Sequence, residues 1–560
     1  MRGLGARLGD SVGAFGAVAR NPNLRWLELA WTGSIIGHYA YLVAVSVYAY
    51  GVGGEKAVGL IFLARLIPAA LAAPFAGLLG DRYRRERVLL LTNLGRIVLV
   101  GSAAAGVFLD APPVVIYILA VAATIATTPF RSAQAALTPS LARSPTELTA
   151  ANAVASGVDS LALFVGPAIA GLFLVFASTG LVFSLTALLL AFSVIFILLI
   201  KVEPTERPKG EVEASTIVSE LFAGFRAIGT HPPLRMMIGL ITAQTAVAGA
   251  VQVYIVVASI ELFGFGKGGV GYLNSAIGVG AFVGAVAALS LTGARRLSPA
   301  FMAGIALWGL PLIALGFWPE AMAALILFGL IGIGNSVSSV AGLTLVQRAV
   351  PDEVLARVFG VIQMLLLASM GIGAAVAPAL LGFLDIEGAL LVTGAFLPLL
   401  VVLTWSQVSR IDSAATAPEA HELRVLGSVP IFAPLPGMTL EHLAGRLVPL
   451  RLEPDTEIVR EGDPGDRFYI VAEGTVEVSE YGRPIAELGA GGYFGEIALI
   501  RDVARTATVT TKTAVVLYAL DRDDFLAAVT SHAPSAEAAE EVVSSRLAGI
   551  PAGGARQPVA

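Results

Sequence analysis

Residues 165–173 read Val-Gly-Pro-Ala-Ile-Ala-Gly-Leu-Phe, and residues 376–384 read Val-Ala-Pro-Ala-Leu-Leu-Gly-Phe-Leu, so one pattern recurs 211 positions later. Two shorter matches recur at nearly the same spacing. They are Asn21–Arg25 with His231–Arg235, and Thr138-Pro139 with Val350-Pro351. Three matches at nearly one offset indicate a duplication, and a chain built in this way has two similar halves.

Each half contains six apolar runs that are long enough to cross a bilayer, which takes about 20 mostly apolar residues. In the first half the runs are 24–50, 57–80, 88–108, 114–137, 149–176 and 181–200. In the second half they are 234–263, 270–291, 300–318, 321–346, 354–384 and 389–408. The sequence therefore predicts an all-α polytopic membrane domain of twelve transmembrane helices, arranged as two six-helix repeats.

The composition agrees with this prediction only for the first part of the chain. Charged residues make up 14% of the 560 residues and hydrophobic residues 56%, whereas soluble domains contain about 25% charged residues. Residues 431–560 nevertheless contain 30 charged residues, of which 19 are acidic. We therefore expect a water-soluble acidic domain after the membrane part. No basic surface for nucleic acid is expected, and the absence of cysteine excludes disulfides and thiolate metal sites.

Basic residues gather in the connections on one side of the predicted membrane domain. They are Arg20, Arg25, Arg82, Arg84, Arg85, Arg87, Lys201, Lys209, Arg235, Arg295, Arg296, Arg357 and Arg410. The connections on the other side carry only Lys56 and Lys267. Because positive loops stay in the cytoplasm, both termini are predicted to be cytoplasmic, in a plasma (inner) membrane. The first apolar run is too long for the core of a cleavable signal peptide.

The connection between the second and third runs, residues 77–87, reads Gly-Leu-Leu-Gly-Asp-Arg-Tyr-Arg-Arg-Glu-Arg. It resembles the signature loop of the major facilitator superfamily, Gly-x-x-x-Asp-Arg-x-Gly-Arg-Arg/Lys, with Arg84 in place of the second glycine. The resemblance covers roughly residues 20–410 and implies a secondary transporter. It also implies that Asp81, Arg82 and Arg85 form a gating latch on the cytoplasmic side.

Two further segments are similar to the drug- and siderophore-exporter branch of that family. They are residues 131–139, Arg-Ser-Ala-Gln-Ala-Ala-Leu-Thr-Pro, and residues 351–357, Pro-Asp-Glu-Val-Leu-Ala-Arg. The resemblance implies export. Spans with so few charges suit a small amphipathic substrate better than a sugar or an ion.

Ionisable residues inside the spans are costly, so they normally face a cavity or a partner. Asp159 and Arg131 are predicted to exchange partners as a proton enters, which would couple transport to a proton gradient; a static salt bridge is the alternative. Glu28 is either a second proton-carrying group or an interfacial partner of Arg25 or Arg87, and His38 is a further candidate. Because the chain has no Gly-x-x-x-x-Gly-Lys-Ser/Thr phosphate loop, we expect neither ATP-driven transport nor an enzyme.

After residue 430 the pattern changes to short β-type runs separated by glycine and proline. The runs are 457–460, 467–472, 475–479, 506–510 and 515–520. Closely spaced strands of this kind predict a small β jelly-roll with flanking helices.

The candidate binding residues lie at the centre of this segment. It reads Phe494-Gly-Glu-Ile-Ala-Leu-Ile500, followed by Arg505-Thr-Ala-Thr508. It resembles the cyclic-nucleotide-binding domain of protein kinase A regulatory subunits, the catabolite activator protein and nucleotide-gated channels. The resemblance implies a phosphate–ribose site formed by Gly495, Glu496, Ile497, Ala498 and Arg505. In that site Glu496 would accept the ribose 2′-hydroxyl, and Arg505 would bind the cyclic phosphate as a planar fork.

Thr506 bears on the choice of nucleotide, because a hydroxyl there can favour guanine in this family. Members that bind cAMP also carry Thr or Ser at this position, so Thr506 does not by itself indicate cGMP. We favour cAMP, and cGMP stays open as the alternative. A helix over 536–547 is expected to cap the base through Val543 or Leu547. It is too short for a DNA-binding helix-turn-helix.

The sequence thus predicts two six-helix bundles, 1–200 and 234–409, joined by a cytoplasmic loop, 201–233. A linker, 410–430, leads to the nucleotide-binding domain, 431–548. The predicted function is proton-coupled export of an amphipathic small molecule, regulated by a cyclic nucleotide. A nontransporting receptor or scaffold, an exporter of the cyclic nucleotide itself and a lipid flippase stay open as alternatives, as does the oligomeric state.

Overall fold

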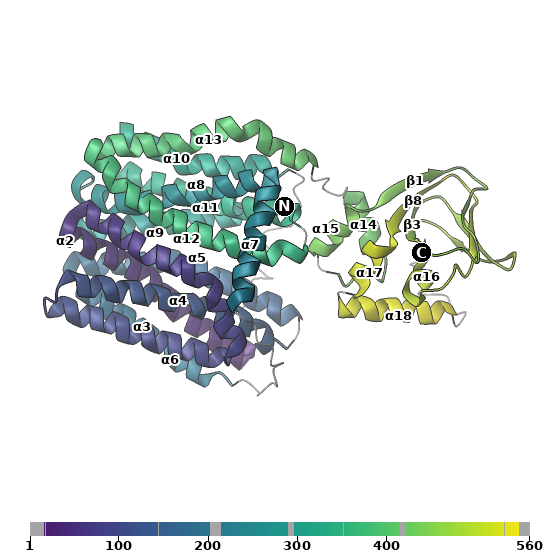
Figure 1. Ribbon diagram of the computed structural model, residues 1–560, viewed down its shortest axis with the longest axis horizontal. Coiled ribbons are helices and arrows are strands. Elements are labelled where there is room, and N and C mark those ends of the chain that lie inside the picture. The colour runs from purple at the N-terminus through teal and green to yellow at the C-terminus, as the bar shows by residue number, and fades with distance from the viewer. Residues whose placement is uncertain are drawn as a thin grey trace, which may run out of the picture. The chain divides into compact units, whose positions relative to one another are not determined.

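The chain forms two compact units in the computed structural model, Met1–Asp412 and Ser413–Ala560. The structure describes residues 16, 18–143, 145–201, 214–288, 296–350, 352–414, 420–435, 437–530 and 532–547. The first unit is helical and the second contains two β-sheets (Figure 1).

The helical unit is built from long apolar helices that run side by side (Figure 1). Those of the first half are α2 (Pro22–Arg82), α3 (Arg85–Phe108), α4 (Pro113–Leu141), α5 (Pro145–Phe176) and α6 (Thr179–Leu199). Those of the second half are α8 (Pro232–Val257) with the π-helix η1 (Ala258–Leu262), α9 (Gly266–Ala288), α10 (Ser298–Phe317), α11 (Ala321–Ala349), α12 (Asp352–Phe383) and α13 (Ile386–Ala414). In the described part of the chain, 11 helical segments are long and apolar enough to cross a membrane.

The first of these segments, Pro22–Ala76, has 55 residues and is long enough for two crossings. Gly53 and Gly54 interrupt α2 with non-helical dihedrals, and Gly54 has a φ of 63° that glycine adopts without strain. Because one crossing takes about 20 residues, the segment spans twice. The twelve predicted crossings are therefore present, and the predicted fold class is confirmed.

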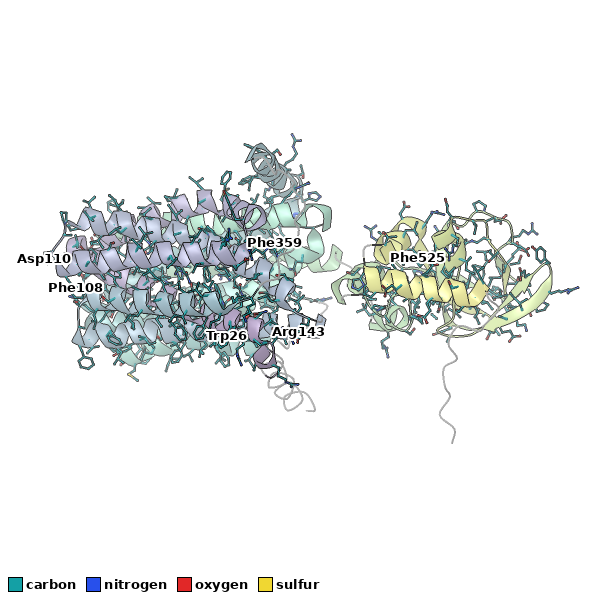
Figure 2. The ribbon with its side chains drawn as sticks, turned by 90° about the horizontal axis from the view of Figure 1, so that it is seen from below. Trp26, Phe108, Asp110, Arg143, Phe359 and Phe525 are labelled. Atoms are coloured by element: carbon teal, nitrogen blue, oxygen red, sulfur yellow. The ribbon has the colours of Figure 1, made fainter. Side chains whose placement is uncertain are left out.

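The connections of the first half lie at both ends of the helical unit. Figure 2 shows Trp26 and Arg143 at one end and Phe108 and Asp110 at the other. Arg143 belongs to the α4–α5 connection and Asp110 to the α3–α4 connection, so successive connections alternate between the two ends.

Helix α7 (Ala214–Thr230) lies in the stretch 201–233, where the sequence analysis expected only a polar loop. Figure 1 shows it crossing the neighbouring long helices. It packs closely on α12, because a Cβ on Gly224 would lie 2.7 Å from the carbonyl oxygen of Arg357. Its opposite side exposes Phe222 and Phe225.

Glycines bring the two halves into backbone contact at two helix crossings. A Cβ on Gly271 of α9 would lie 2.4 Å from the Cα of Gly171 of α5. A Cβ on Gly59 of α2 would lie 2.6 Å from the carbonyl oxygen of Ala374 of α12. Larger side chains at these positions would push the helices apart.

The second unit holds two four-stranded antiparallel sheets with the orders β1-β8-β3-β6 and β2-β7-β4-β5. The strands are β1 (Val448–Leu452), β2 (Glu457–Val459), β3 (Arg467–Glu473), β4 (Val476–Glu480), β5 (Arg483–Leu488), β6 (Tyr493–Phe494), β7 (Thr508–Thr511) and β8 (Val515–Asp521). The helices are α14 (Ala420–Gly427), α15 (Gly437–Ala444), α16 (Glu496–Arg501), α17 (Arg522–Thr530) and α18 (Ala533–Leu547). The predicted jelly-roll with flanking helices is confirmed.

Strand β3 separates two apolar cores, because successive side chains point to opposite faces of a sheet. Phe468 packs with Phe432 and Phe525 under the helices, and Phe525 is labelled in Figure 2. Tyr469 and Val471 pack in the other core, between the sheets.

The expected linker, 410–430, is largely structured. Helix α13 continues to Ala414, and α14 begins at Ala420. Leu426 and Val429 are fully buried in the core of the second unit. Because their burial stabilises this unit, these residues are part of the domain.

Candidate functional site

The turn that is predicted to bind the cyclic phosphate, called the phosphate turn below, lies at Gly495 between β6 and α16. Gly495 forms the N-cap of α16. The φ of Gly495 is 95°, a left-handed backbone conformation that residues other than glycine rarely adopt. A Cβ there would also lie 2.6 Å from Nη1 of Arg505 and 2.9 Å from the carbonyl oxygen of Arg467. Glycine is therefore required both for the turn and for the close approach of Arg505.

Arg505 is held against this turn from the loop before β7. Its side chain is 3% exposed, and its Nη2 donates to the carbonyl oxygen of Arg467 at 2.8 Å and to Oδ1 of Asp466 at 3.1 Å. Its Nη1 donates to the carbonyl oxygen of Gly495 at 3.3 Å. The Asp466 side chain is 74% exposed, so Arg505 is a buried guanidinium with a solvated partner and is suited to bind an anion.

Glu496, the first residue of α16, is 1% exposed. Its Oε1 accepts a hydrogen bond from Nη1 of Arg546 at 2.8 Å, while Oε2 is buried and has no partner among the described residues. Burial raises the pKa of the Glu496 carboxyl, and the Arg546 guanidinium opposes part of that rise. A buried acceptor without a donor is destabilising. A ligand hydroxyl that donates a hydrogen bond to Oε2 would remove this cost.

Arg546 is a site residue that the sequence analysis missed. It lies on α18 and also donates from Nη2 to the carbonyl oxygen of Tyr493 at 3.0 Å, with its guanidinium 4.5 Å from the Tyr493 ring centroid. A second ion pair, Arg501 with Glu540, joins α16 to α18. Two ion pairs therefore connect α18 to α16, the helix that begins at the phosphate turn.

The other predicted site residues occupy the same turn with different exposure. Ala498 is buried against Gly465, Ile497 is half-buried, and Thr506 is exposed next to Arg505. Of the two predicted base-capping residues on α18, Val543 is fully buried and Leu547 is exposed. In this conformation only Leu547 is accessible at the surface.

In the helical unit the structure brings Asp159 of α5 together with Arg131 of α4. Oδ2 of Asp159 lies 3.7 Å from Nη2 of Arg131, and Oδ1 accepts a hydrogen bond from Nε1 of Trp31 at 2.9 Å. Both charged side chains are partly exposed. This carboxylate therefore has a charged partner, a neutral partner and access to the outside of the packed helices.

Glu28 is 5% exposed, and neither carboxylate oxygen has a partner in the part of the chain that the structure describes. The interpretation of Glu28 as a partner of Arg25 or Arg87 is therefore not supported. Burial without a hydrogen-bond partner is costly for a carboxyl group.

The predicted latch is described only in part. The side chains of Asp81 and Arg82 lie outside the described residues. Arg85 donates from Nη1 to the carbonyl oxygen of Ala136, which ties the start of α3 to α4.

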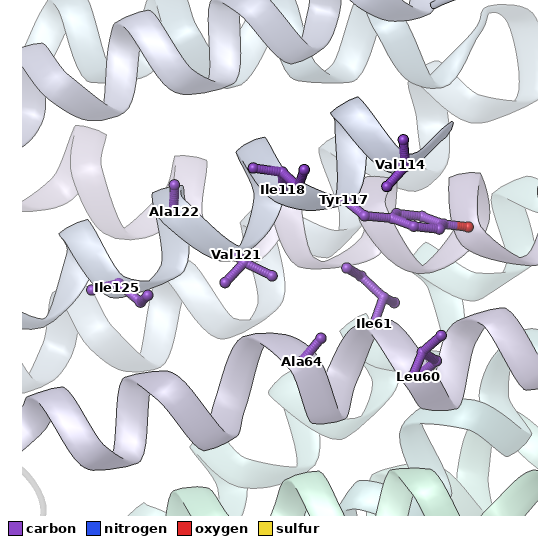
Figure 3. A pocket seen from close by; sticks show the side chains of 9 residues that line it. All are labelled: Leu60, Ile61, Ala64, Val114, Tyr117, Ile118, Val121, Ala122 and Ile125. Carbon is purple, nitrogen blue, oxygen red and sulfur yellow. The ribbon is translucent and has the colours of Figure 1, made fainter. Parts of the chain in front are cut away.

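An apolar groove of about 450 Å³ runs between α2 and α4. Figure 3 shows Leu60, Ile61 and Ala64 of α2 facing α4, whose lining residues are Val114, Tyr117, Ile118, Val121, Ala122 and Ile125. None of the lining residues is charged. Because Leu60, Val114 and Ile118 are largely exposed, this groove is an outer surface suited to apolar chains.

Comparisons with known proteins divide the chain in the same way. The model of the Major Facilitator Superfamily matches residues 29–366, and the model of the cyclic nucleotide-binding domain matches residues 449–532. The matched helical segment is more than half of the chain. The second match contains the turn at Gly495, Glu496 and Arg505.

Curated relatives match over short segments. The cAMP-dependent protein kinase regulatory subunit of Yarrowia lipolytica is 41% identical over 102 residues, which are 18% of this chain and 27% of that protein. The corresponding subunit of Dictyostelium discoideum is 44% identical over 91 residues, 15% and 28% of the two chains. A cyclic nucleotide-gated potassium channel of Rhizobium etli is 34% identical over 128 residues, 23% and 36% of the two chains.

These alignments span between 27% and 36% of the three relatives' own lengths, and the family models cover the larger part of the chain. The exporter branch inferred from residues 131–139 and 351–357 is a finer assignment than these matches provide. The protein is a multi-pass membrane protein with a cyclic nucleotide-binding domain after its helical unit, and it belongs to the Major Facilitator Superfamily.

Proposed function

We propose that this protein is a proton-coupled secondary transporter that exports an amphipathic small molecule and is regulated by a cytoplasmic cyclic nucleotide, cAMP in preference to cGMP. Both termini would lie in the cytoplasm, at the plasma (inner) membrane. The observation that carries the regulatory part is Oε2 of Glu496, which is buried beside Arg505 and has no partner in the part of the chain that the structure describes. One ligand group with a hydroxyl next to a phosphate satisfies both side chains.

Transport is supported by the duplicated halves and by their contacts. The halves meet through glycines such as Gly171 and Gly271, and the hydrogen bond from Oγ of Ser275 to the carbonyl oxygen of Phe164 also joins α9 to α5. Asp159 contacts two partners at once, Arg131 through Oδ2 and Trp31 through Oδ1. Protonation of Asp159 would release Arg131, while the hydrogen bond from Trp31 would keep the neutral side chain in place, so one proton changes the charge balance of the site.

Regulation requires that the nucleotide bind with different affinity to two states of the transporter. The contact between Arg546 and Glu496 supplies a route, because a ribose hydroxyl that bonds to Glu496 alters the carboxylate that holds α18. Helix α18 would then move or tighten when the nucleotide enters.

We expect Asp159→Asn to lose proton-driven flux, since asparagine keeps the size and the hydrogen bond to Trp31 but carries no proton. Flux is measured in proteoliposomes with an imposed pH gradient, using dansylglycine, dansylamide and dansylcholine as fluorescent probes. The matched control is Asp110→Asn, at the exposed connection between α3 and α4. Wild-type flux of no probe would contradict transport, and gradient-driven flux in Asp159→Asn would contradict its coupling role.

We expect Arg546→Ala to bind cAMP but to lose the effect of cAMP on flux, because Arg505 still binds the phosphate while α18 is released. Wild-type flux should change several-fold at saturating cAMP. Arg460→Ala is the matched control, since it removes an exposed ion pair with Glu457. An unchanged wild-type flux would end the regulatory proposal, and a normal cAMP response of Arg546→Ala would exclude this route.

A further inference from the structure

Two guanidinium groups are buried in the first half of the helical unit with neutral partners. Arg65 of α2 is 1% exposed, and its Nε donates to Oγ1 of Thr124 at 2.8 Å. Its guanidinium carbon lies 5.2 Å from the ring centroid of Tyr41 and 5.9 Å from that of Phe62. These groups solvate the positive charge but do not neutralise it.

Arg96 of α3 is 3% exposed and has a similar environment. Its Nη1 donates to Oγ of Ser34 at 2.7 Å and to Oδ1 of Asn93 at 3.0 Å. Asn93 in turn donates to Oγ of Ser193 at 2.8 Å. All the members of this hydrogen-bonded chain other than Arg96 are uncharged.

The charges of this region therefore do not balance. Among the described residues, Arg131 has an ion pair with Asp159, whereas neither Arg65 nor Arg96 has one. Glu28 forms no ion pair with either arginine, since neither of its oxygens has a hydrogen-bond partner among the described residues. Arginine stays charged in proteins, and a charge at membrane depth needs a counter-charge or a cavity.

A small pocket of about 80 Å³ lies next to these positively charged side chains. Arg96 and Arg131 both line it, and Ser34 and Thr127 add hydroxyl groups. Trp31 and Phe130 form its apolar part, with stacked rings whose centroids are 5.9 Å apart. The pocket has room for a compact charged group of a few heavy atoms, next to an aromatic surface.

We propose that this pocket binds the anionic group of the transported molecule, so that the substrate is an amphipathic organic anion. The inference rests on the proposed transport function and names its substrate class. A carboxylate, sulfonate or phosphate meets Arg96 and Arg131 inside the pocket, and the rest of the molecule lies outside this volume of about 80 Å³. A cationic amphipath would add a further positive charge to a site that already has an excess.

The test measures binding to the purified full-length chain in nanodiscs by energy transfer from tryptophan to a dansyl group. Dansylglycine carries a carboxylate, dansyltaurine a sulfonate, dansylamide no charge and dansylcholine a quaternary ammonium. We expect the two anions to bind at least about tenfold more tightly than the other probes, as charge-assisted hydrogen bonds imply. Arg96→Gln and Arg131→Gln should each remove most of this preference, measured as the ratio of the dansylglycine affinity to the dansylamide affinity.

Arg226→Gln, on the exposed side of α7, is the matched control and should retain the preference. Arg131 is largely exposed, so its replacement tests the proposal even if Arg96→Gln does not fold. Equal or tighter binding of dansylcholine, failure of both anions to bind, or an unchanged preference in Arg131→Gln would overturn the proposal. Flux of dansylcholine or dansylamide without flux of either anion would overturn the substrate class and leave transport intact.

Discussion

Replacing Arg505 by alanine is expected to weaken binding of cAMP and of cGMP to the full-length chain by at least about 30-fold. Removing one partner of a buried charge pair costs about 2–5 kcal/mol, and each 1.4 kcal/mol is about a factor of ten in affinity. The Arg505 side chain is 3% exposed and bonds to two backbone carbonyl groups at the turn. Alanine therefore removes the charge and also loosens the turn.

Titration calorimetry on the purified protein measures this change for both nucleotides. Arg505→Lys separates the two contributions, because lysine keeps the charge but lacks the planar fork that pairs with a phosphate. We expect its affinity to lie between those of the wild type and Arg505→Ala.

Arg451→Ala is the matched control, since Arg451 is an exposed arginine on β1. Its affinity for both nucleotides should equal that of the wild type. If Arg505→Ala bound cAMP within threefold of the wild type, the phosphate would be held somewhere other than the turn at Gly495.

The parts of the fold that the sequence predicted are those in which the local pattern has one physical solution. Twenty apolar residues in a row cross a bilayer as a helix, because helix formation satisfies every backbone group within the segment. The turn at Gly495 was predictable for a similar reason. Its φ of 95° and the approach of Arg505 admit glycine alone, so the spacing of Gly495, Glu496 and Arg505 marks the turn.

The elements that were missed are not marked by a long apolar run or by a clear strand pattern. Strand β5 is almost entirely exposed and β1 has no fully buried residue, so neither shows a clear alternation of buried and exposed residues. Helices α7 and α14 are amphipathic, but α7 has 17 residues, too few for a crossing, and α14 has only 8. Arg546 lies 50 residues after Glu496, and only the folded domain brings the two together.

The membrane charges illustrate the same limit. Sequence could place Glu28, Arg65 and Arg96 inside apolar runs, but their roles depend on which groups face them. The structure gives Arg96 the hydroxyl of Ser34 and gives Glu28 no partner among the described residues. Proximity in space, which no spacing along the chain encodes, leaves Glu28 buried and without the ion-pair partners that its position in the sequence suggested.

Replacing Gly271 by leucine is expected to open the contact between the two halves at the end of the helical unit that carries Asp110. A Cβ on Gly271 would lie 2.4 Å from the Cα of Gly171 and 2.4 Å from the carbonyl oxygen of Pro167. Both obstacles are backbone atoms, so no side-chain rotation relieves the clash. Overpacking costs about 1–3 kcal/mol, which corresponds to a shift of about 5- to 150-fold toward the separated state.

Because the chain contains no cysteine, spin labels can be placed without removing native residues. Leu109→Cys and Trp318→Cys put one label in each half, at exposed sites in the connections α3–α4 and α10–α11. Double electron–electron resonance should then show a longer label distance in Gly271→Leu. Gly239→Leu, where a Cβ would meet nothing within 4 Å, should keep the wild-type distance. Equal distances in all three proteins would mean that the halves do not separate at the α5–α9 crossing, and alternating access would need another hinge.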